Sequence, residues 1–396
     1  MRLRRLLATT LVGASMGFFT SCGSIQLGSS VGANEAGQRV ESEQVNFEVE
    51  RLIGGLDHPW GMAFLPEGGM LVTERGGDLR LVNADFSLDP TPLGGVPTAF
   101  ARGQGGMLDV ALDPDFAANR LVYLSYSYLA DVEAGGGAGT AVARGRLGEG
   151  ALDDVEVIFR SNGLGSGSRH FGSRLVFDAE GHLYVTHGDR GQRALAQELD
   201  NHAGSVLRLN ADGSVPVDNP FVGRSDALAE IFSYGHRNPQ GMAIHPETGA
   251  VWVHEHGPRG GDEVNILAPG ANFGWPVVSQ GREYATGLAV GVDESPAGMV
   301  APRHVWDPSI APSGMVFYEG EAFPEWQGDL LVGALAYQLL ARLELDGDAV
   351  IHEERLLERE LGRIRDVDVD DAGLVYLLID AANGGIYRLR PAGTAS

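Results

Sequence analysis

The 396-residue chain contains no lysine, and all 29 of its basic residues are arginine. This absence excludes mechanisms that need a lysine amine, such as Schiff-base chemistry, pyridoxal phosphate anchoring, P-loop phosphate binding and Ser–Lys catalysis. The only cysteine is Cys22. The chain therefore cannot build an internal disulfide, a thiolate zinc site or a cysteine-ligated iron–sulfur cluster.

Positive charge is also scarce, because 53 acidic residues give the chain a formal net charge of −24. Such a surface repels phosphate backbones, so we expect no nucleic-acid binding. Hydrophobic residues make up 43% and charged residues 21% of the sequence, a balance that supports a packed core. The 57 glycines are about twice the usual share and have no three-residue period, which excludes collagen and indicates many tight turns.

The first 21 residues have the features of a signal peptide. Arg2, Arg4 and Arg5 precede a mostly apolar stretch over residues 6–19, which is short for a membrane span. Thr20-Ser21-Cys22 resembles a lipobox, although Phe19 stands where the pattern prefers leucine. We expect export and a lipid on Cys22, giving a periplasmic or outer-surface lipoprotein that contacts a membrane only through this anchor. A soluble secreted protein and an uncleaved anchor are the alternatives.

Residues 22–46 are rich in Gly, Ser, Asn and Glu and predict a flexible tether. The folded domain is expected over residues 47–392, where one phrase recurs six times: a small residue, an apolar alternation, a Pro/Asp/Gly turn and a short β-rich run. The copies begin at Gly61, Gly106, Gly172, Gly241, Gly314 and Ile364.

This repeat predicts an all-β fold, a six-bladed β-propeller. Period-2 alternation between glycine and aspartate turns is typical of half-buried antiparallel strands, and repeats of this length with about four strands each are typical of propeller blades. A pair of β-sandwiches would not explain six similar phrases. Only residues 193–199 and 352–361 suggest helices, and both segments are short. In a propeller, function is expected on loops at one mouth of the central channel.

Several of the predicted loops carry polar clusters. His170 lies at the entry of a predicted strand and suits a general base, because its unperturbed pKa is near neutrality; a structural histidine is the alternative. Asp189 could orient a cation or an arginine, or belong to an ordinary turn. Arg237 and Asn238 offer a charged fork and an amide for carboxylate and carbonyl recognition.

Two further clusters suggest ion binding. His254 and His256 share one strand face and form a candidate metal pair without a third ligand fixed by spacing. The carboxylates that follow, together with exposed backbone carbonyls, favour calcium; these acidic residues are Glu255, Asp262 and Glu263. Arg363 and Arg365, two residues apart on an extended segment, point the same way and predict an anion site, with two surface salt bridges as the alternative.

Taken together, the clusters resemble the soluble, pyrroloquinoline quinone (PQQ) dependent sugar dehydrogenases, especially their aldose sugar dehydrogenase branch. The resemblance covers residues 47–390. The motifs that carry it are GQGGMLDVALDPDF, RHFGSRLVFD, SYGHRNPQGMAIHP, EHGPRGGDEVNIL, GANFGWP, APSGMVFY and RIRDV, in this order. It implies a six-bladed propeller that holds PQQ over a calcium ion at the mouth of the channel.

The resemblance also implies roles for individual residues. These are His170 as the base for the anomeric hydroxyl, Gln104 as a neighbour of cofactor and sugar, Arg237 and Asn238 as contacts of the quinone, Gly257 and Pro258 as carbonyl ligands of calcium, and Arg363 and Arg365 as partners of cofactor carboxylates. The implied reaction moves hydride from sugar C1 to PQQ C5 and yields a lactone. The sugar is then a small-molecule partner, the electron acceptor is not identified, and we expect a monomer.

Two positions depart from the family pattern. The family commonly has a lysine where this chain has Ala336, and the chain has no lysine at all. Losing one cation from a tricarboxylate site would cost on the order of 1–3 kcal/mol. Arg169 stands where the glucose-oxidising branch has an aspartate, which could alter sugar choice or replace the missing cation.

Two other functions fit the same fold. One is a non-catalytic propeller that binds a glycan or a protein partner, which the absent lysine favours. The other is a calcium-dependent lactonase, which needs several acidic or amide side chains converging on the metal from different blades.

Overall fold

The computed structural model describes residues 37–131 and 136–393. All of them belong to one compact unit, residues 34–396. The predicted signal peptide, Cys22 and most of the predicted tether lie outside the described residues. No helix in the described part of the chain is long and apolar enough to cross a membrane.

Almost all regular structure is β-strand, arranged as six antiparallel sheets. Listed from the inner strand outward, the first sheet contains β3 (Pro59–Phe64), β4 (Met70–Glu74) and β5 (Leu79–Val82), and the second contains β6 (Met107–Leu112), β7 (Leu121–Leu129), β8 (Ala138–Leu147) and β9 (Leu152–Arg160). The third contains β10 (Leu175–Phe177), β11 (His182–His187), β12 (Ser205–Asn210) and β13 (Ile231–Tyr234), and the fourth contains β14 (Pro239–Ile244), β15 (Val251–Glu255), β16 (Asp262–Ile266) and β17 (His304–Trp306). The fifth contains β18 (Pro312–Phe317), β19 (Leu330–Ala334), β20 (Leu340–Asp346) and β21 (Ala349–Leu356), and the sixth contains β22 (Ile364–Val369), β23 (Val375–Ile379), β24 (Gly384–Pro391), β2 (Phe47–Leu56) and β1 (Gln38–Val40).

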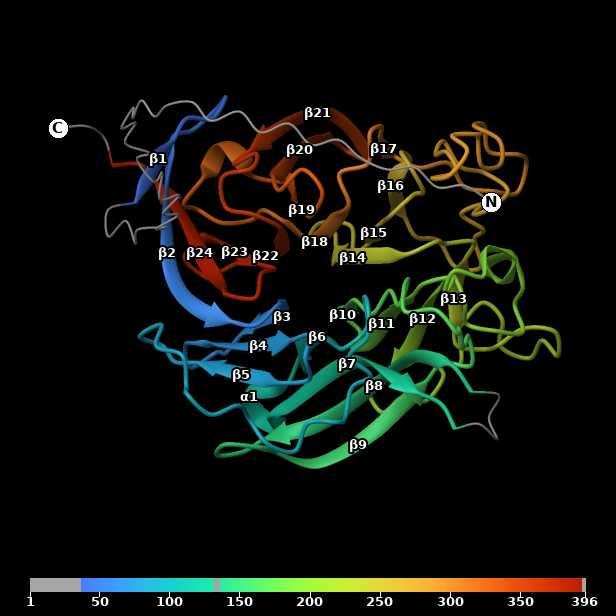
Figure 1. The fold of residues 1–396 in the computed structure, drawn as a ribbon, viewed down its shortest axis with the longest axis horizontal. Coiled ribbons are helices and arrows are strands. Elements are labelled where there is room, and N and C mark those ends of the chain that lie inside the picture. Colours follow the sequence, from blue (N-terminus) through green and yellow to red (C-terminus); the bar gives the residue numbers. More distant parts are fainter. Residues whose placement is uncertain (1–36, 132–135, 394–396) are drawn as a thin grey trace, which may run out of the picture. The chain divides into compact units, whose positions relative to one another are not determined.

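Figure 1 shows the six inner strands β3, β6, β10, β14, β18 and β22 around the centre of the molecule. Each predicted repeat supplies the inner strand of one blade and the strand that follows it. The six-bladed β-propeller predicted from the repeats is therefore confirmed.

Glycines at the start of the repeats allow the inner strands to approach one another closely. A Cβ on Gly314 of β18 would lie 2.1 Å from Oδ1 of Asp366 on β22. A Cβ on Gly61 of β3 would lie 2.5 Å from Oδ1 of Asp109 on β6. The small residue in the repeat is thus required by contact between neighbouring blades.

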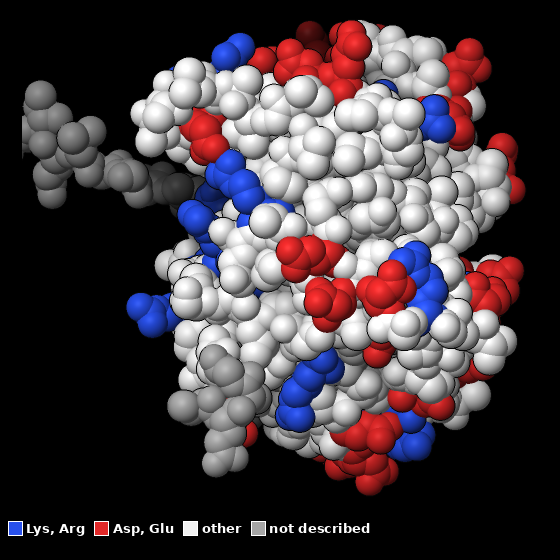
Figure 2. All heavy atoms as spheres, turned by 90° about the vertical axis from the view of Figure 1, so that its right-hand side faces the viewer, with Lys and Arg blue, Asp and Glu red and all other residues white. Residues whose placement is uncertain are grey.

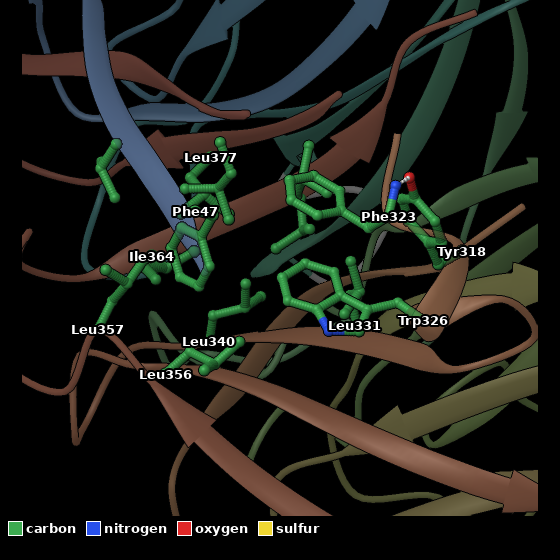
Figure 3. Close-up of a cluster of buried hydrophobic side chains, with 14 of the residues drawn as sticks. Phe47, Tyr318, Phe323, Trp326, Leu331, Leu340, Leu356, Leu357, Ile364 and Leu377 are labelled. Atoms are coloured by element: carbon green, nitrogen blue, oxygen red, sulfur yellow. Dashed lines mark hydrogen bonds between the residues drawn. The ribbon is translucent and has the colours of Figure 1, made fainter. Parts of the chain in front are cut away.

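The circle is closed by the N-terminal strand β2, which pairs antiparallel with the C-terminal strand β24. Phe47 at the start of β2 enters a core between two blades, with its ring 5.8 Å from that of Trp326. In Figure 3 the Phe47 ring lies among aliphatic side chains that include Ile364 and Leu377. Because β2 and β24 belong to one sheet, the last blade is built from both the N-terminal and the C-terminal part of the domain, and this pairing closes the ring of blades.

Two of the sequence predictions need correction. The tether was expected to reach residue 46, but Gln38–Val40 form β1, which pairs with β2, because the outer edge of β2 offers unpaired backbone groups. The helix expected over residues 352–361 is wrong, since Ala349–Leu356 form the outer strand β21 against β20. The segment 193–199 does contain a short 3-10 helix, η2 (Arg193–Gln197); α1 (Phe116–Asn119) and η3 (Pro324–Trp326) are equally short.

Figure 2 shows acidic side chains interspersed with arginines over one face of the protein. This face therefore presents charges of both signs.

Candidate active site

A cavity of about 250 Å³ opens at the end of the channel where the inner strands begin. Its wall includes Trp60 of β3, Gln240 of β14 and Arg365 of β22. Two more arginines, Arg75 and Arg363, also line it. None of the described residues that line this cavity is acidic, so it is a positively charged recess in an acidic protein.

Arg365 is buried in the wall of this cavity. Its Nη1 donates to Oε1 of Gln240 over 3.1 Å, while its buried Nε has no hydrogen-bond partner. Burial lowers the pKa of Arg365 to about 10, although the nearby Asp380 carboxylate opposes the shift. Arg365 is therefore still charged at neutral pH and keeps a donor for an anion.

Arg363 is more exposed and pairs with Asp380, its Nε donating to Oδ2 over 3.0 Å. The second oxygen of Asp380 accepts from Nδ1 of His58 over 2.7 Å. Burial alone would raise the pKa of Asp380. The Arg365 charge and the hydrogen bonds from His58 and Arg363 outweigh this effect and hold the pKa of Asp380 below its usual value. An ionised Asp380 thus fixes the direction of the Arg363 side chain.

His170 lies immediately beside the cavity. It adopts a left-handed backbone conformation with φ of 57°, and its N–H donates to Oε1 of Gln104 over 2.7 Å. Its ring nitrogen Nδ1 lies 2.6 Å from Oδ1 of Asp189. Because an ionised carboxylate only accepts hydrogen bonds, Nδ1 carries the proton and Nε2 keeps a free lone pair.

Burial lowers the pKa of His170 below its usual value, and the Arg237 guanidinium lowers it further, against the opposing effect of Asp189. The imidazole is therefore neutral at pH 7. A neutral imidazole with a free Nε2 can accept a proton, which is the requirement for a general base.

Asp189 is held by two further donors. Trp275 donates its indole N–H to Oδ2 over 2.8 Å, and the Gly191 N–H donates to Oδ1 over 2.7 Å. Burial alone would raise the pKa of Asp189, but these bonds and the His170 contact keep it below its usual value. Asp189 therefore stays ionised and sets the orientation of His170.

Arg237 lies in a second, very small pocket, which shares His256 with the larger cavity. Its Nη1 donates to the carbonyls of His256 and Gly257 over 2.8 and 2.6 Å, and its guanidinium lies 5.3 Å from the centre of the Trp275 ring. The neighbouring Asn238 directs Oδ1 toward the Gly172 N–H, 3.3 Å away. Arg237 thus joins the segment before β14 to the loop after β15 of the same blade, and Asn238 reaches the segment before β10 of the preceding blade.

The Gly257–Pro258 segment is fixed by Asp262. Oδ1 of Asp262 accepts from the Gly257 N–H and from the Ser309 hydroxyl, both over 2.8 Å. The same hydroxyl lies 3.3 Å from the Pro258 carbonyl. Burial raises the pKa of Asp262 to about 6. Asp262 therefore holds the backbone of this segment, directly at Gly257 and through Ser309 at Pro258.

The metal pair proposed for His254 and His256 gains no third ligand. Nε2 of His256 lies 2.6 Å from the Pro312 carbonyl, to which it donates, and His254 is fully buried without a hydrogen-bond partner. Among the described residues, one group of three side chains can meet around an ion, and it lies at the β10–β11 turn: Asp178, Glu180 and His182.

The site residues predicted from the sequence thus fall into three positions relative to the cavity. Gln104, Arg363 and Arg365 line it. Arg237 and Gly257 line the adjoining small pocket. The other three candidates, His170, Asn238 and Pro258, are linked to these residues by the contacts above but do not line either space.

The sequence did not predict the roles of three residues at the site, and it suggested a role for one residue that does not line the cavity. Asp189 was expected to orient a cation or an arginine, yet it pairs with His170; Arg75 and Trp275 were not assigned roles. Arg169, considered as a substitute cation, is exposed and does not line the cavity. The His170–Asp189 contact follows from the β10–β11 hairpin, where Leu175 pairs with Val185. Extended beyond the paired residues, this register brings residues 170 and 189 close together. The hairpin pattern of the sequence could therefore have indicated the contact, although no motif encodes it.

Comparison with known proteins confirms the family that the motifs predict. The glucose/sorbosone dehydrogenase family model matches residues 56–388. The aldose sugar dehydrogenase YliI of Escherichia coli is 46% identical over 87% of this chain and 92% of its own length. The apo crystal structure of a soluble aldose sugar dehydrogenase from Escherichia coli superposes with a TM-score of 0.84, at 45% identity over 87% of this chain and all of that one.

A PQQ-bound aldose sugar dehydrogenase from Streptomyces coelicolor superposes with a TM-score of 0.72, at 29% identity over 87% of this chain and 98% of that one. The family match over residues 56–388 runs from the end of β2 into β24 and so includes strands of every blade. The chain therefore belongs to the glucose/sorbosone dehydrogenase family and is an oxidoreductase of the aldose sugar dehydrogenase type.

Proposed function

We propose that the protein oxidises aldose sugars at C1 to lactones, with PQQ and calcium as cofactors and His170 as the general base. The observation that carries the proposal is the arginine-lined cavity beside an imidazole whose Nε2 is free. The PQQ-bound relative supports the choice of cofactor.

The residues present fit an anionic cofactor. Arg365 has an unsatisfied buried Nε at the cavity wall, and Arg363 is oriented by Asp380. Guanidinium groups recognise carboxylates through charge-assisted hydrogen bonds, and PQQ carries three carboxylates. Arg363 and Arg365 would hold PQQ, and Gln104, Arg237 and Asn238 would border it. When bound, PQQ supplies the electrophilic quinone that takes up hydride from C1 of the sugar.

Calcium would be held by the carbonyls of Gly257 and Pro258. Both are neutral oxygen donors of the kind that calcium accepts. The Gly257 carbonyl accepts from Arg237 and the Pro258 carbonyl from the Ser309 hydroxyl, so the ion would take over both oxygens from these donors. Two acidic residues pair across the strands on either side of this loop, Glu255 of β15 and Glu263 of β16. Burial and the Glu255 charge raise the pKa of Glu263 to about 8. The ion would supply Lewis-acid polarisation of the quinone.

His170 would take the hydroxyl proton of the sugar at Nε2 while the C1 hydride leaves. Asp189 stabilises the positive imidazole ring that results, through the 2.6 Å contact at Nδ1. The Arg237 charge, which lowers the pKa of His170, favours release of that proton to solvent afterwards. The chain therefore supplies the proton acceptor and its orientation.

The test is reconstitution of the purified protein with PQQ and calcium, followed by dye reduction with a panel of aldoses. His170→Ala should lose at least about 100-fold in kcat while still binding PQQ. His182→Ala, which removes an imidazole paired with Asp178 at a surface turn, is the matched control and should retain activity. Activity of His170→Ala equal to that of the wild type contradicts the proposed base.

A second function is favoured by one observation, the absence of a lysine at Ala336. A non-catalytic propeller that binds a glycan or a protein partner would oxidise no aldose, even with PQQ bound. PQQ binding with no oxidation of any aldose in the panel would support this second function against the first.

We also propose that the protein is exported and held to a membrane by a lipid on Cys22. Metabolic labelling with a radioactive fatty acid tests this directly. The wild type should incorporate label and sediment with membranes, whereas Cys22→Ser should do neither. Unlabelled wild-type protein in the soluble fraction contradicts the proposal.

A further inference from the structure

We propose that Arg75 binds a carboxylate of the anionic cofactor and takes the place of the lysine that this chain lacks at position 336. The inference rests on the proposed function, because it assigns a further cofactor-binding residue to the same site. Arg75 lies in the turn between β4 and β5, outside the polar clusters that the sequence singled out.

The first support is location. Arg75 lines the same 250 Å³ cavity as Arg363, Arg365 and Ala336. Ala336 is exposed toward this space, so its short side chain leaves room where a lysine would extend. Arg75 thus brings a third cation to the cavity from the first blade, while Arg363 and Arg365 come from the last.

The second support is the fixed backbone of Arg75. Its N–H donates to the His58 carbonyl over 3.0 Å, and its carbonyl accepts from the Met107 N–H over 3.2 Å. Gly106 packs directly against it, and a Cβ at that position would lie 1.9 Å from the Arg75 carbonyl oxygen. Arg75 is therefore anchored between two blades at the rim of the cavity.

The third support is that the charge of Arg75 is not neutralised. Its guanidinium makes one long hydrogen bond, from Nη1 to the Gly103 carbonyl over 3.4 Å. No carboxylate of the described residues pairs with it, whereas Arg363 pairs with Asp380 and the nearby Arg80 pairs with Glu74. An unpaired guanidinium lining a cavity without acidic residues is suited to bind an anion.

Arg169 is the rival for this role. Its side chain is exposed and lies against Gly191, where a Cβ would come within 2.9 Å of its Nε. It does not line the cavity. The geometry therefore favours Arg75.

The experiment is an equilibrium titration of the calcium-loaded full chain with PQQ, followed by quenching of tryptophan fluorescence, since Trp60 lines the cavity. Arg75→Gln should weaken PQQ binding roughly 10- to 100-fold, as expected for loss of a charge-assisted bond. Arg39→Gln, which removes an exposed arginine from the outermost strand β1, and Arg169→Gln should each bind within about twofold of the wild type.

Rescue separates a lost cation from a damaged fold. In the Arg75→Gln background, Ala336→Lys restores the cation at the family position, and binding should recover to within about fivefold of the wild type. Arg75→Gln binding as tightly as the wild type overturns the proposal, as does failure of Ala336→Lys to improve binding. A wild-type chain that binds no PQQ overturns the proposed function together with this inference, whereas the other two results leave the proposed function intact.

Discussion

Substituting Asp189 by Asn tests how His170 is held. The 2.6 Å contact between Asp189 and Nδ1 of His170 is a charge-assisted hydrogen bond, and such bonds contribute about 1.5–3 kcal/mol. That stabilisation grows as the imidazole becomes protonated, so its loss should lower kcat about 10- to 100-fold. An asparagine can also donate to Nδ1, which would place the ring proton on Nε2 and remove the base, enlarging the effect.

The pH profile distinguishes this positioning role from simple damage. Activity requires neutral His170, so the rate rises with pH through its pKa, which lies below the ordinary histidine value because of burial. Asp189 raises that pKa. Asp189→Asn should therefore move the acidic limb of kcat/KM to lower pH, and PQQ affinity should change by less than about threefold, because Asp189 does not line the cavity.

The assay is dye-linked aldose oxidation by the reconstituted enzyme over a range of pH. Asp178→Asn is the matched control, since Asp178 makes a similar contact with Nδ1 of His182, at 3.1 Å, on the β10–β11 turn. It should leave kcat within about twofold. An unchanged kcat for Asp189→Asn, or an acidic limb that moves to higher pH, would refute the reasoning.

Three further substitutions give distinct outcomes. Arg365→Met should weaken PQQ binding about 10- to 100-fold by fluorescence titration without lowering Tm, because it removes a buried charge with an unsatisfied Nε; unchanged affinity would contradict its role. Gly314→Ala should destabilise the protein by about 2–4 kcal/mol in urea unfolding, since its Cβ would meet Asp366; wild-type stability would disprove the close contact. Burial raises the pKa of Asp368 to about 7, with Asp366 adding to the shift. Its contribution to stability is therefore present at low pH and lost as pH rises through 7, so Asp368→Asn should raise Tm at about pH 8.5 more than at pH 5. The exposed Asp371→Asn should show no such difference, and equal effects at both pH values would contradict the expected shift.

The blades could be predicted from the sequence because each repeat carries its own strand alternation and turn residues. The repeat marks only a small residue at its start, and the structure supplies the reason at Gly314, where Asp366 of the next inner strand lies against it. That contact depends on packing between the inner strands of neighbouring blades. Pairing of β1 with β2 was missed for a related reason, since the three-residue segment Gln38–Val40 is too short to show an alternation and forms a strand only against an existing edge.

The residues of the candidate site that belong to sequence motifs could be predicted, whereas those brought to the site only by contacts between blades could not. Gln104, Arg363 and Arg365 belong to motifs and do line one cavity. Arg75 comes from an ordinary hairpin turn, and only ring closure brings it to the same space. The partner of His170 required the hairpin register, which a motif does not encode.

The most direct test of the central claim is a single-turnover measurement on the full chain loaded with PQQ and calcium. An aldose is mixed with the loaded protein in the absence of an electron acceptor, and the absorbance of the oxidised quinone is followed. The wild type should lose this absorbance in one phase that His170→Ala slows at least about 100-fold, with lactone formed in equal amount. Stable absorbance in the wild type at saturating sugar, with PQQ demonstrably bound, would contradict the account.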